Sequence, residues 1–317
     1  METVLVTGGA GFIGSHLLER LLSRGERLIC VDNFDPYYSP DIKRRNIEHI
    51  IHDRNLELIE CDIRDKEKLG KIFRDHRIDS IVHLAARAGV RASISEPHVY
   101  QDVNIGGTIN LLELAKDYSI KNFVFGSSSS VYGASDRIPF HEDDSLTPPL
   151  SPYAATKQAG EMFCHTYRHL YNIHITCLRF FTVYGPRQRP DMAIHKFTSL
   201  IDRGEEIPLY GDGSSQRDYT YISDIIDGVV SALDKNLDFG IINLGESQIT
   251  RLTRLISLIE ENLGKKAKIR KLPDQPGDVP VTFADISKAG TLLGYSPRVN
   301  IDDGIESFVK WYRKQAQ

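Results

Sequence analysis

The 317-residue sequence predicts an α/β protein built on a doubly wound parallel sheet, with a smaller α/β lobe toward the C-terminal end. Two observations carry this prediction. In the first half, short apolar runs rich in β-branched residues alternate with segments whose apolar residues recur at helical spacing, a pattern typical of parallel strands covered by helices. After about Phe181 the alternation thins, and turn-rich stretches such as 210–213 and 273–278 appear. We therefore expect two closely joined lobes with a ligand site in the cleft between them.

The individual strands and helices follow from the same two patterns, taken in chain order. Apolar runs predict strands at 3–6, 27–31, 56–60, 80–84, 122–125 and 173–178. Apolar residues at helical spacing predict helices at 12–24, 66–75, 99–118 and 153–171, and shorter ones at 251–263 and 301–314. Because helices separate most of the strands, consecutive strands are expected to run parallel.

The stretch 7–14 has the sequence TGGAGFIG and joins the first predicted strand to the first predicted helix. Gly8, Gly11 and Gly14 permit a tight bend and a close approach of the backbone to a pyrophosphate, and the helix N-terminus offers free N–H groups to the phosphates. The second predicted strand ends at Asp32, whose carboxylate can accept both ribose hydroxyls of NAD and would repel the 2′-phosphate of NADP. Strand, helix and acid in this register predict a Rossmann-like domain that binds NAD.

Tyr153 and Lys157 are four residues apart on a predicted helix and therefore share one of its faces. An ammonium beside a phenol favours the phenolate. We therefore expect Lys157, together with the positive nicotinamide ring, to lower the pKa of Tyr153 from its usual value near ~10. Such a tyrosine can take a proton from a substrate hydroxyl while hydride leaves the same carbon. Combined with the glycine-rich loop and the serine-rich strand end that precede it, the pair predicts a catalytic site.

Composition and charge exclude several other functions. The formal net charge is −4 at pH 7, which argues against nucleic acid or an anionic membrane surface as the main partner. No apolar run approaches the roughly 20 residues of a membrane helix, and the first predicted strand begins too early to leave room for a signal peptide. The four cysteines are scattered in or beside apolar segments, and no Cys/His spacing indicates a metal. We expect a cytoplasmic protein with reduced thiols and no metal.

Together these motifs resemble the extended short-chain dehydrogenase/reductase family, specifically its branch of nucleotide-sugar epimerases and dehydratases. The resemblance reaches from the first strand to at least Trp311, and it rests on 7–14, Asp62, 83–86, 122–133, the Tyr153/Lys157 pair and 210–221. It implies an NAD-binding Rossmann domain over 1–180 with a returning segment around 218–246, and a nucleotide-sugar-binding lobe over 181–317. It also implies a homodimer in which two helices of each subunit form a four-helix bundle.

The resemblance assigns roles to single residues. Ser128 stands four residues before the tyrosine of the VYG motif, where the family has a Ser or Thr that contacts the reacting hydroxyl. Asp62 resembles the acid that contacts adenine, and Lys157 would also bind the nicotinamide ribose. The motifs and the resemblance together imply this set of cofactor contacts: Gly8, Gly11, Phe12, Ile13, Gly14, Asp32, Asn33, Asp62, Ile63, Ala85, Ala86, Tyr153 and Lys157.

The two residues directly before the VYG motif distinguish the reactions catalysed within this branch. Relatives that dehydrate sugars resemble Thr-Asp-Glu there, and decarboxylating relatives resemble Thr-Ser-Glu. This chain has Ser129 and Ser130 and therefore no carboxylate at either position. A second proton transfer, in addition to the one made by Tyr153, would therefore lack the acidic side chain that usually performs it. The pattern predicts 4-epimerisation, an isomerisation through reversible hydride transfer and a transient 4-keto sugar.

Two segments indicate which sugar is the substrate. Residues 33–46 and 179–193 most resemble the UDP-glucuronate 4-epimerase group, and Gln275 departs from the arginine of UDP-glucose 4-epimerases. We expect UDP-glucuronate to be converted into UDP-galacturonate. Two alternatives stay open: epimerisation of UDP-glucose or its N-acetyl analogue, and decarboxylation of UDP-glucuronate. A non-catalytic NAD sensor of similar fold is disfavoured by the intact tyrosine and lysine.

A uronate carboxylate needs hydrogen-bond donors and nearby positive charge. Four hydroxyls can donate, those of Ser128, Ser129, Ser130 and Thr182, and Arg189 can contribute the charge. We hypothesise that these groups hold the carboxylate away from the alignment in which a β-keto acid loses carbon dioxide.

Other charged residues are candidates for the nucleotide. Arg217 is the candidate for the diphosphate, because its guanidinium matches phosphate oxygens bidentately. Asp278 resembles the family residue that accepts a hydrogen bond from the uridine ribose. Arg91 fits either a sugar contact or a surface ion pair, and we interpret the basic stretch 43–45 as a solvated turn.

Overall fold

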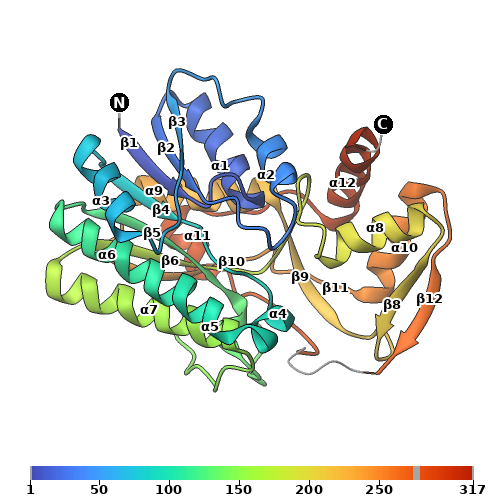
Figure 1. Cartoon of the computed structure of the whole chain (residues 1–317). Helices are drawn as coiled ribbons and strands as arrows, with labels where there is room; N and C mark the ends of the chain where they lie inside the picture. Colours follow the sequence, from blue (N-terminus) through green and yellow to red (C-terminus); the bar gives the residue numbers. More distant parts are fainter. Residues whose placement is uncertain (1, 274–278, 316–317) are drawn as a thin grey trace.

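The computed structural model describes residues 2–273 and 279–315 and contains a large and a small α/β lobe (Figure 1). The large lobe is built on a seven-stranded sheet with the order β10-β6-β5-β4-β1-β2-β3, in which every neighbouring pair is parallel. Its strands are β1 (Thr3–Thr7), β2 (Arg27–Asp32), β3 (Leu56–Glu60), β4 (Ser80–His83), β5 (Asn122–Ser128), β6 (His174–Phe180) and β10 (Phe239–Leu244). The predicted doubly wound parallel sheet is confirmed.

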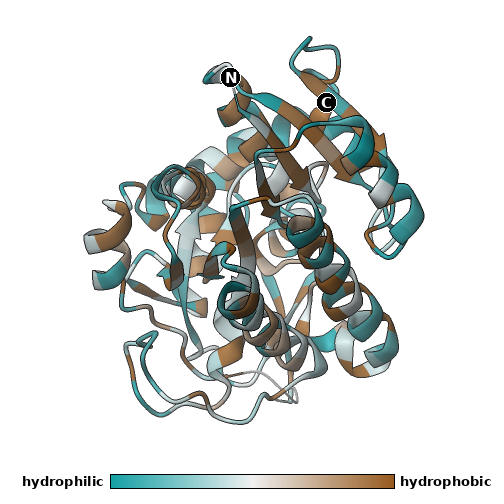
Figure 2. Cartoon of the chain, turned by 90° about the vertical axis from the view of Figure 1, so that its left-hand side faces the viewer, coloured by the Kyte–Doolittle hydropathy of each residue, from teal (hydrophilic) through white to brown (hydrophobic). Residues whose placement is uncertain are grey.

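Helices cover both faces of this sheet. One face carries α1 (Phe12–Ser23), α9 (Ile222–Lys235) and α11 (Ser287–Leu293). The other face carries α3 (Lys66–Asp75), α6 (Gly107–Asp117) and α7 (Pro152–Tyr171). The helices in Figure 2 show both hydrophobic and hydrophilic segments, as expected when one side of a helix packs on a core and the other meets solvent.

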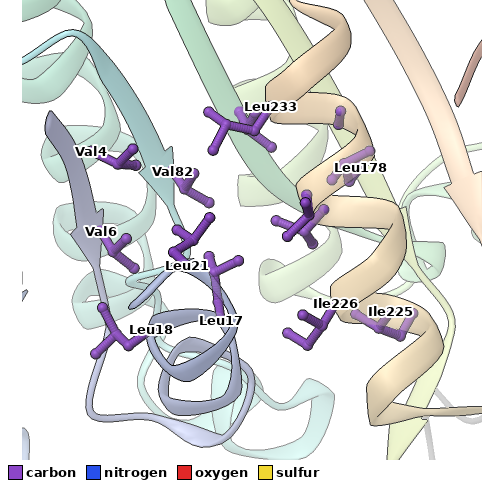
Figure 3. Close-up of a cluster of buried hydrophobic side chains, with 14 of the residues drawn as sticks. Val4, Val6, Leu17, Leu18, Leu21, Val82, Leu178, Ile225, Ile226 and Leu233 are labelled. Atoms are coloured by element: carbon purple, nitrogen blue, oxygen red, sulfur yellow. The ribbon is translucent and has the colours of Figure 1, made fainter. Parts of the chain in front are cut away.

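The alternation of side chains along β1 shows how the two cores are separated. Val4 and Val6 belong to the cluster in which Leu17 and Leu21 of α1 lie close to the sheet (Figure 3). Leu5 belongs to the cluster on the opposite face. Successive residues of a strand point to opposite faces, so a sheet covered on both sides needs continuous apolar runs. This requirement explains why the strands were visible in the sequence.

The small lobe contains two short sheets, ordered β11-β9-β7 and β12-β8. Its elements are β7 (Thr182–Tyr184), α8 (Ala193–Asp202), β8 (Glu206–Tyr210), β9 (Gln216–Tyr221), β11 (Ile249–Arg251), α10 (Leu252–Leu263), β12 (Lys268–Leu272) and α12 (Ile301–Gln315). A third core joins α8, α10 and α12 through residues such as Phe197, Leu255 and Phe308. Between these elements the chain returns to the large lobe, where α9 covers the sheet and β10 forms its edge.

One predicted helix is wrong in its detail. The stretch 99–118 is not a continuous α-helix, because α5 (Pro97–Tyr100) leads into a π-helical segment, η1 (Gln101–Gly106), before α6 begins. A wider π turn is rare and frequently marks a functional site, and apolar spacing does not reveal it. Among the described residues, no helix combines the length and apolar character needed to cross a membrane.

The structure also contains short helices that were not predicted. Three of them are α2 (Pro40–Ile47), α4 (Val90–Ser95) and the 3₁₀ turn η2 (Ser129–Tyr132), and the longer helices α8 and α9 and the short α11 were not predicted either. α2, α4 and η2 all begin in loops that follow the carboxyl end of a sheet strand, and each contributes residues to the lining of the cleft.

Candidate active site

A cleft of about 820 Å³ lies at the carboxyl ends of the sheet strands and extends to the small lobe. Open parallel sheets bind ligands at this edge. Every predicted site residue that the structure describes lines this cleft. The lining residues from the cofactor set are Gly8, Gly11, Phe12, Ile13, Gly14, Asp32, Asn33, Asp62, Ile63, Ala85, Ala86, Tyr153 and Lys157, and those from the substrate set are Ser128, Ser129, Ser130, Thr182, Arg189 and Arg217. Asp278 lies outside the described residues.

The glycine-rich loop has the geometry of a phosphate cradle. A Cβ atom added at Gly14 would lie 2.2 Å from the Gly8 carbonyl oxygen, and one added at Gly8 would lie 2.7 Å from the Ala85 nitrogen. Gly8 also has a φ of +72°, which disfavours other residues. Helix α1 begins directly after Gly11, which has no side chain to cap the first N–H groups. The glycines therefore let the backbone of the loop pack closely, and helix α1 begins there with uncapped backbone N–H groups, as an anion site requires.

Asp32 ends β2 beside this loop. Its carboxylate accepts hydrogen bonds from the backbone N–H of Ala10 at 3.1 Å and of Phe34 at 2.8 Å. Burial raises the pKa of Asp32, while the charge of Lys43 and the two N–H groups oppose that rise. These backbone contacts orient the carboxylate and leave it lone pairs for further donors.

Lys43 corrects the interpretation of 43–45 as a solvated turn. Its side chain is buried on α2 and lines the cleft, and its Nζ donates to the Asp35 carbonyl oxygen at 2.9 Å. Only Arg44 and Arg45 of that stretch are exposed. The spacing of Lys43 with the buried Asn46 could have indicated this burial, because these residues share one helix face.

Asp62 lies at the cleft in the loop after β3. It accepts a hydrogen bond from the Asn33 side chain at 2.8 Å and two from the Arg64 guanidinium, at 2.8 and 2.9 Å. The Arg64 contact lowers the pKa of Asp62 to about 2. Asp62 is therefore ionised at neutral pH and able to accept hydrogen bonds.

The three residues predicted to be catalytic, Ser128, Tyr153 and Lys157, lie together at the cleft. Ser151 caps α7 by accepting a hydrogen bond from the Ala154 N–H, which places Tyr153 in the first turn facing the cleft. The Ser128 hydroxyl, at the end of β5, makes a hydrogen bond with the Tyr153 phenol. Lys157 follows one turn later and donates from Nζ to the Gly126 carbonyl oxygen at 2.6 Å.

The expected effect of Lys157 on the pKa of Tyr153 is not found. Burial raises the pKa of Tyr153, and the effects that oppose the rise come from the Ser128 hydrogen bond and the charge of Arg189. Lys157 directs its ammonium at Gly126 and over the Phe125 ring, and burial lowers its own pKa to about 8. The protein alone therefore acts on the phenol through Ser128 and Arg189.

The predicted sugar contacts come from both lobes. Ser130 donates from Oγ to the Ser128 Oγ at 3.0 Å, so the serine turn is internally ordered. Arg189 is held by Asp191 through two hydrogen bonds, at 3.0 Å from Nε and 2.6 Å from Nη2. Thr182 begins β7, two residues after Phe180, which pairs with Ser128 across the adjacent strands β5 and β6, and it lines the cleft.

The two other candidate arginines, Arg217 and Arg91, each make contacts within the protein. Arg217 on β9 donates to the backbone carbonyl oxygens of Gln216 at 2.9 Å and of Pro280 at 3.2 Å. The Arg91 guanidinium lies 4.6 Å from the centre of the Tyr210 ring. Both arginines line the cleft.

Asn104, a buried residue of the π-helical segment, was not among the predicted site residues. Its side chain accepts from the Arg87 N–H at 2.8 Å, and donates to the Arg87 carbonyl oxygen and to the Thr156 hydroxyl, both at 3.0 Å. It therefore joins the loop after β4 to the helix that carries Tyr153. Nothing in the local pattern distinguishes it, because only the π turn directs it inward.

A second missed feature is the ion pair of Glu161 and Arg179, whose side chains are 4% and 2% exposed. Arg179 donates from Nε and Nη2 at 2.9 and 2.8 Å, and the Ser127 hydroxyl donates to the same carboxylate at 2.6 Å. The pair ties α7 to β5 and β6, and so fixes the positions of Ser128 and Tyr153. Its signal was available: Glu161 follows Tyr153 by two helical turns on one face.

The chain is similar to known proteins in sequence and in structure. A family model described as GDP-mannose 4,6 dehydratase matches residues 5–308. The UDP-glucuronate 4-epimerase of Thermodesulfobacterium geofontis is 44% identical over 318 residues, covering 100% of this chain and 98% of the relative.

Two solved structures resemble the fold throughout. One is the UDP-glucuronic acid 4-epimerase of Bacillus cereus in complex with UDP-glucuronic acid and NAD, with a TM-score of 0.93, 41% identity and 99% of each chain covered. The other is the UDP-glucose 4-epimerase of Thermotoga maritima with UDP-glucose, with a TM-score of 0.90, 33% identity and coverage of 99% of this chain and 100% of that one.

Proposed function

Because the chain belongs to the GDP-mannose 4,6 dehydratase family, within the extended short-chain dehydrogenases/reductases, we propose that it is an NAD-dependent 4-epimerase of UDP-glucuronate. The product is UDP-galacturonate, so the enzyme is an isomerase. One observation carries the proposal: Tyr153, Lys157 and Ser128 meet the glycine-rich loop in one cleft, next to Ser129 and Ser130 rather than acids. The relatives that act on UDP-glucuronate agree with this assignment.

The residues present fit NAD. The phosphate cradle at Gly8 and Gly14 has no room for a Cβ atom, and Asp32 and Asp62 offer acceptors at the ends of neighbouring strands. When bound, NAD supplies the acceptor and donor of the C4 hydride. Lys157 and Tyr153 would hold its nicotinamide ribose.

Tyr153 acts as general base and then as general acid. Its phenolate takes the proton of the C4 hydroxyl, and the phenol so formed returns that proton after the 4-keto sugar has presented its other face. Ser128 holds this phenol by a hydrogen bond and shares the reacting hydroxyl with it. The charge of Arg189 opposes the burial that raises the pKa of Tyr153, and so favours the phenolate.

The preference for a uronate rests on the serine turn together with Thr182 and Arg189. Ser129, Ser130 and Thr182 offer hydroxyl donors around the cleft, and Arg189 adds a guanidinium. A site built to hydrogen-bond a substrate group rejects an analogue that lacks it, because its own polar groups are then left unpaired. The same hydrogen bonds would hold the carboxylate away from the geometry of decarboxylation.

The remaining expectations concern organisation and location. Residues 1–180 with a return at 218–246 would bind NAD, and 181–317 would bind the nucleotide sugar. A homodimer is favoured by Met162 and Leu170, which are 66% and 60% exposed on α7. Reduced, buried thiols favour a cytoplasmic location. They are Cys30, Cys61, Cys164 and Cys177.

Proton NMR of the purified protein with UDP-glucuronate and NAD, run to equilibrium, tests the function. We expect a mixture of the glucuronate and galacturonate nucleotides without a pentose nucleotide. Formation of UDP-pentose and carbon dioxide would identify a decarboxylase and contradict the role of the serines. An unchanged substrate, with turnover of UDP-glucose, would contradict the assignment of the sugar but not that of the chemistry.

A further inference from the structure

Tyr37, in the loop after β2, contacts both sides of the cleft. The guanidinium of Arg87, in the loop after β4, lies 4.8 Å from the centre of its ring. The guanidinium of Arg189, in the segment after β7, lies 5.4 Å from the same centre. All three side chains line the cleft. Tyr37 therefore connects the loops beside the glycine-rich loop to the segment that leads into the small lobe.

Each partner of Tyr37 is itself held by a carboxylate. Arg87 pairs with Asp35 and, at 2.7 Å, with Glu96. Arg189 is held by Asp191 through two hydrogen bonds. The Tyr37 hydroxyl donates to the same Asp191 at 3.4 Å. The ring thus meets two guanidiniums whose positions are already fixed, so little freedom is lost when it packs against them.

The backbone leaves room for this hydroxyl only because Gly89 has no side chain. A Cβ atom added at Gly89 would lie 2.8 Å from the Tyr37 Oη, and Gly89 has a φ of +113°. Burial raises the pKa of Tyr37, and the charge of Asp191 adds to the rise. The phenol therefore keeps its proton near neutral pH and donates a hydrogen bond to Asp191.

The loop that carries Tyr37 starts at Asp32 and Asn33, which line the cofactor part of the cleft. We propose that Tyr37 is a positioning residue for the cofactor: by joining this loop to Arg189 and Asp191, it closes the cleft over NAD and slows its release. The sugar nucleotide can then exchange while NAD stays bound through many turnovers. This inference rests on the proposed function for the identity of the cofactor.

The rate at which NAD leaves the protein tests this role. Holoenzyme loaded with isotopically labelled NAD is mixed with excess unlabelled NAD, and the retained label is measured over time after rapid gel filtration. Tyr37→Ala removes the ring and the hydroxyl, and we expect release about tenfold faster, from the loss of two cation–π contacts and one hydrogen bond. Tyr37→Phe keeps the ring, and we expect release only about threefold faster.

A remote tyrosine provides the matched control. Tyr118, 41% exposed at the end of α6, contacts Phe73 and lies outside the cleft lining, so Tyr118→Phe should release NAD at the wild-type rate. Release from Tyr37→Ala at the wild-type rate would overturn the proposal. Thermal unfolding of each holoenzyme shows whether faster release comes from a general loss of stability. If Tyr37→Phe released NAD as fast as Tyr37→Ala and both variants were destabilised, the proposal would also be overturned.

A double-mutant cycle tests whether Tyr37 acts through Asp191. Asp191→Asn weakens the acceptor shared by Tyr37 and Arg189, and we expect the double variant with Tyr37→Phe to release NAD more slowly than the two single effects multiplied. Independent effects would contradict the link. The label experiment needs no sugar turnover. An epimerase assay that fails on UDP-glucuronate would therefore refute the proposed function without touching this result.

Discussion

The two halves of the cleft that we propose to bind the cofactor (the cofactor half) and the sugar (the sugar half) are built in different ways. The cofactor half consists of the glycine-rich loop with Asp32 and Asp62, and its key groups are backbone atoms and strand-end carboxylates. The sugar half consists of the serine turn 128–130 with Thr182, Arg189 and Arg217, and its key groups are side chains from separate segments. A backbone cradle needs a local sequence pattern, whereas a side-chain pocket needs the lobes to pack correctly. The two halves should therefore respond differently to substitution.

Tyr153→Phe, at the junction of the two halves, should have the largest effect. Removal of the proton acceptor should lower kcat about 10³-fold, in the range expected for general acid–base catalysis. The NAD content and the KM for UDP-glucuronate should stay close to wild type, because the ring still packs near Tyr100. Initial rates and NAD per protomer measure both quantities. A variant that keeps a tenth of the activity would show that another group takes the proton.

Gly14→Ala should break the cofactor half alone. The added Cβ would lie 2.2 Å from the Gly8 carbonyl oxygen and 2.7 Å from the Gly9 Cα, so the cradle must shift. We expect NAD affinity to fall about 100-fold and the free energy of unfolding to fall by about 1–3 kcal/mol. Titration calorimetry and denaturant unfolding test these values.

The control for this substitution is Gly106→Ala. Nothing lies within 4 Å of a Cβ atom at Gly106, and its φ of −58° is helical. We expect it to leave NAD binding unchanged and to raise stability by up to about 1 kcal/mol. Equal losses in both variants would show that the loop geometry is not the cause.

Thr182→Val should affect the sugar half alone. If its hydroxyl holds the uronate carboxylate, its loss should raise the KM for UDP-glucuronate about tenfold, as expected for a hydrogen bond to a charged group. It should also increase the fraction of decarboxylated by-product and leave NAD affinity unchanged. Steady-state kinetics and NMR of the product mixture check all three. An unchanged KM together with an unchanged by-product would contradict the carboxylate role.

The pH dependence of the stability of Asp62→Asn should show how much the charge of this carboxylate contributes in the cofactor half. Arg64 lowers the pKa of Asp62 to about 2, so the contribution of this carboxylate is present above its unfolded pKa near ~4 and is lost as the pH falls toward 2. We expect the variant to be less stable by about 1 kcal/mol at pH 7, since the pair is partly exposed, and closer to wild type at acidic pH.

Denaturant unfolding at pH 7 and pH 3 measures this difference, and Asp75→Asn serves as its control. Asp75 is paired with Lys71 on the surface of α3, where solvent screens the charges, so its substitution should change stability less. A difference for Asp62→Asn that does not depend on pH would assign the effect to the lost Asn33 contact rather than to the charge.

Much of the site was visible in the sequence because its signals are local. The glycine spacing of 8, 11 and 14, the acid that ends β2 and the Tyr153/Lys157 spacing are each contained in one element or one turn. The structure brings these residues into one cleft. The fold class was predictable for the same reason, since a sheet covered on both faces forces apolar runs and intervening helices.

The sequence by itself determined the parallel sheet, and it predicted the cradle for a dinucleotide and the position of Tyr153 beside it, because helical and strand periods place neighbouring residues on known faces. Only the tertiary structure decided which other side chains surround these motifs in the cleft. The burial of Lys43, the inward turn of Asn104 and the contact of Tyr37 with Arg189 depend on loops packing across large sequence separations. The raised pKa of Tyr153 was likewise decided by the tertiary structure, because burial depends on the packed fold rather than on sequence spacing.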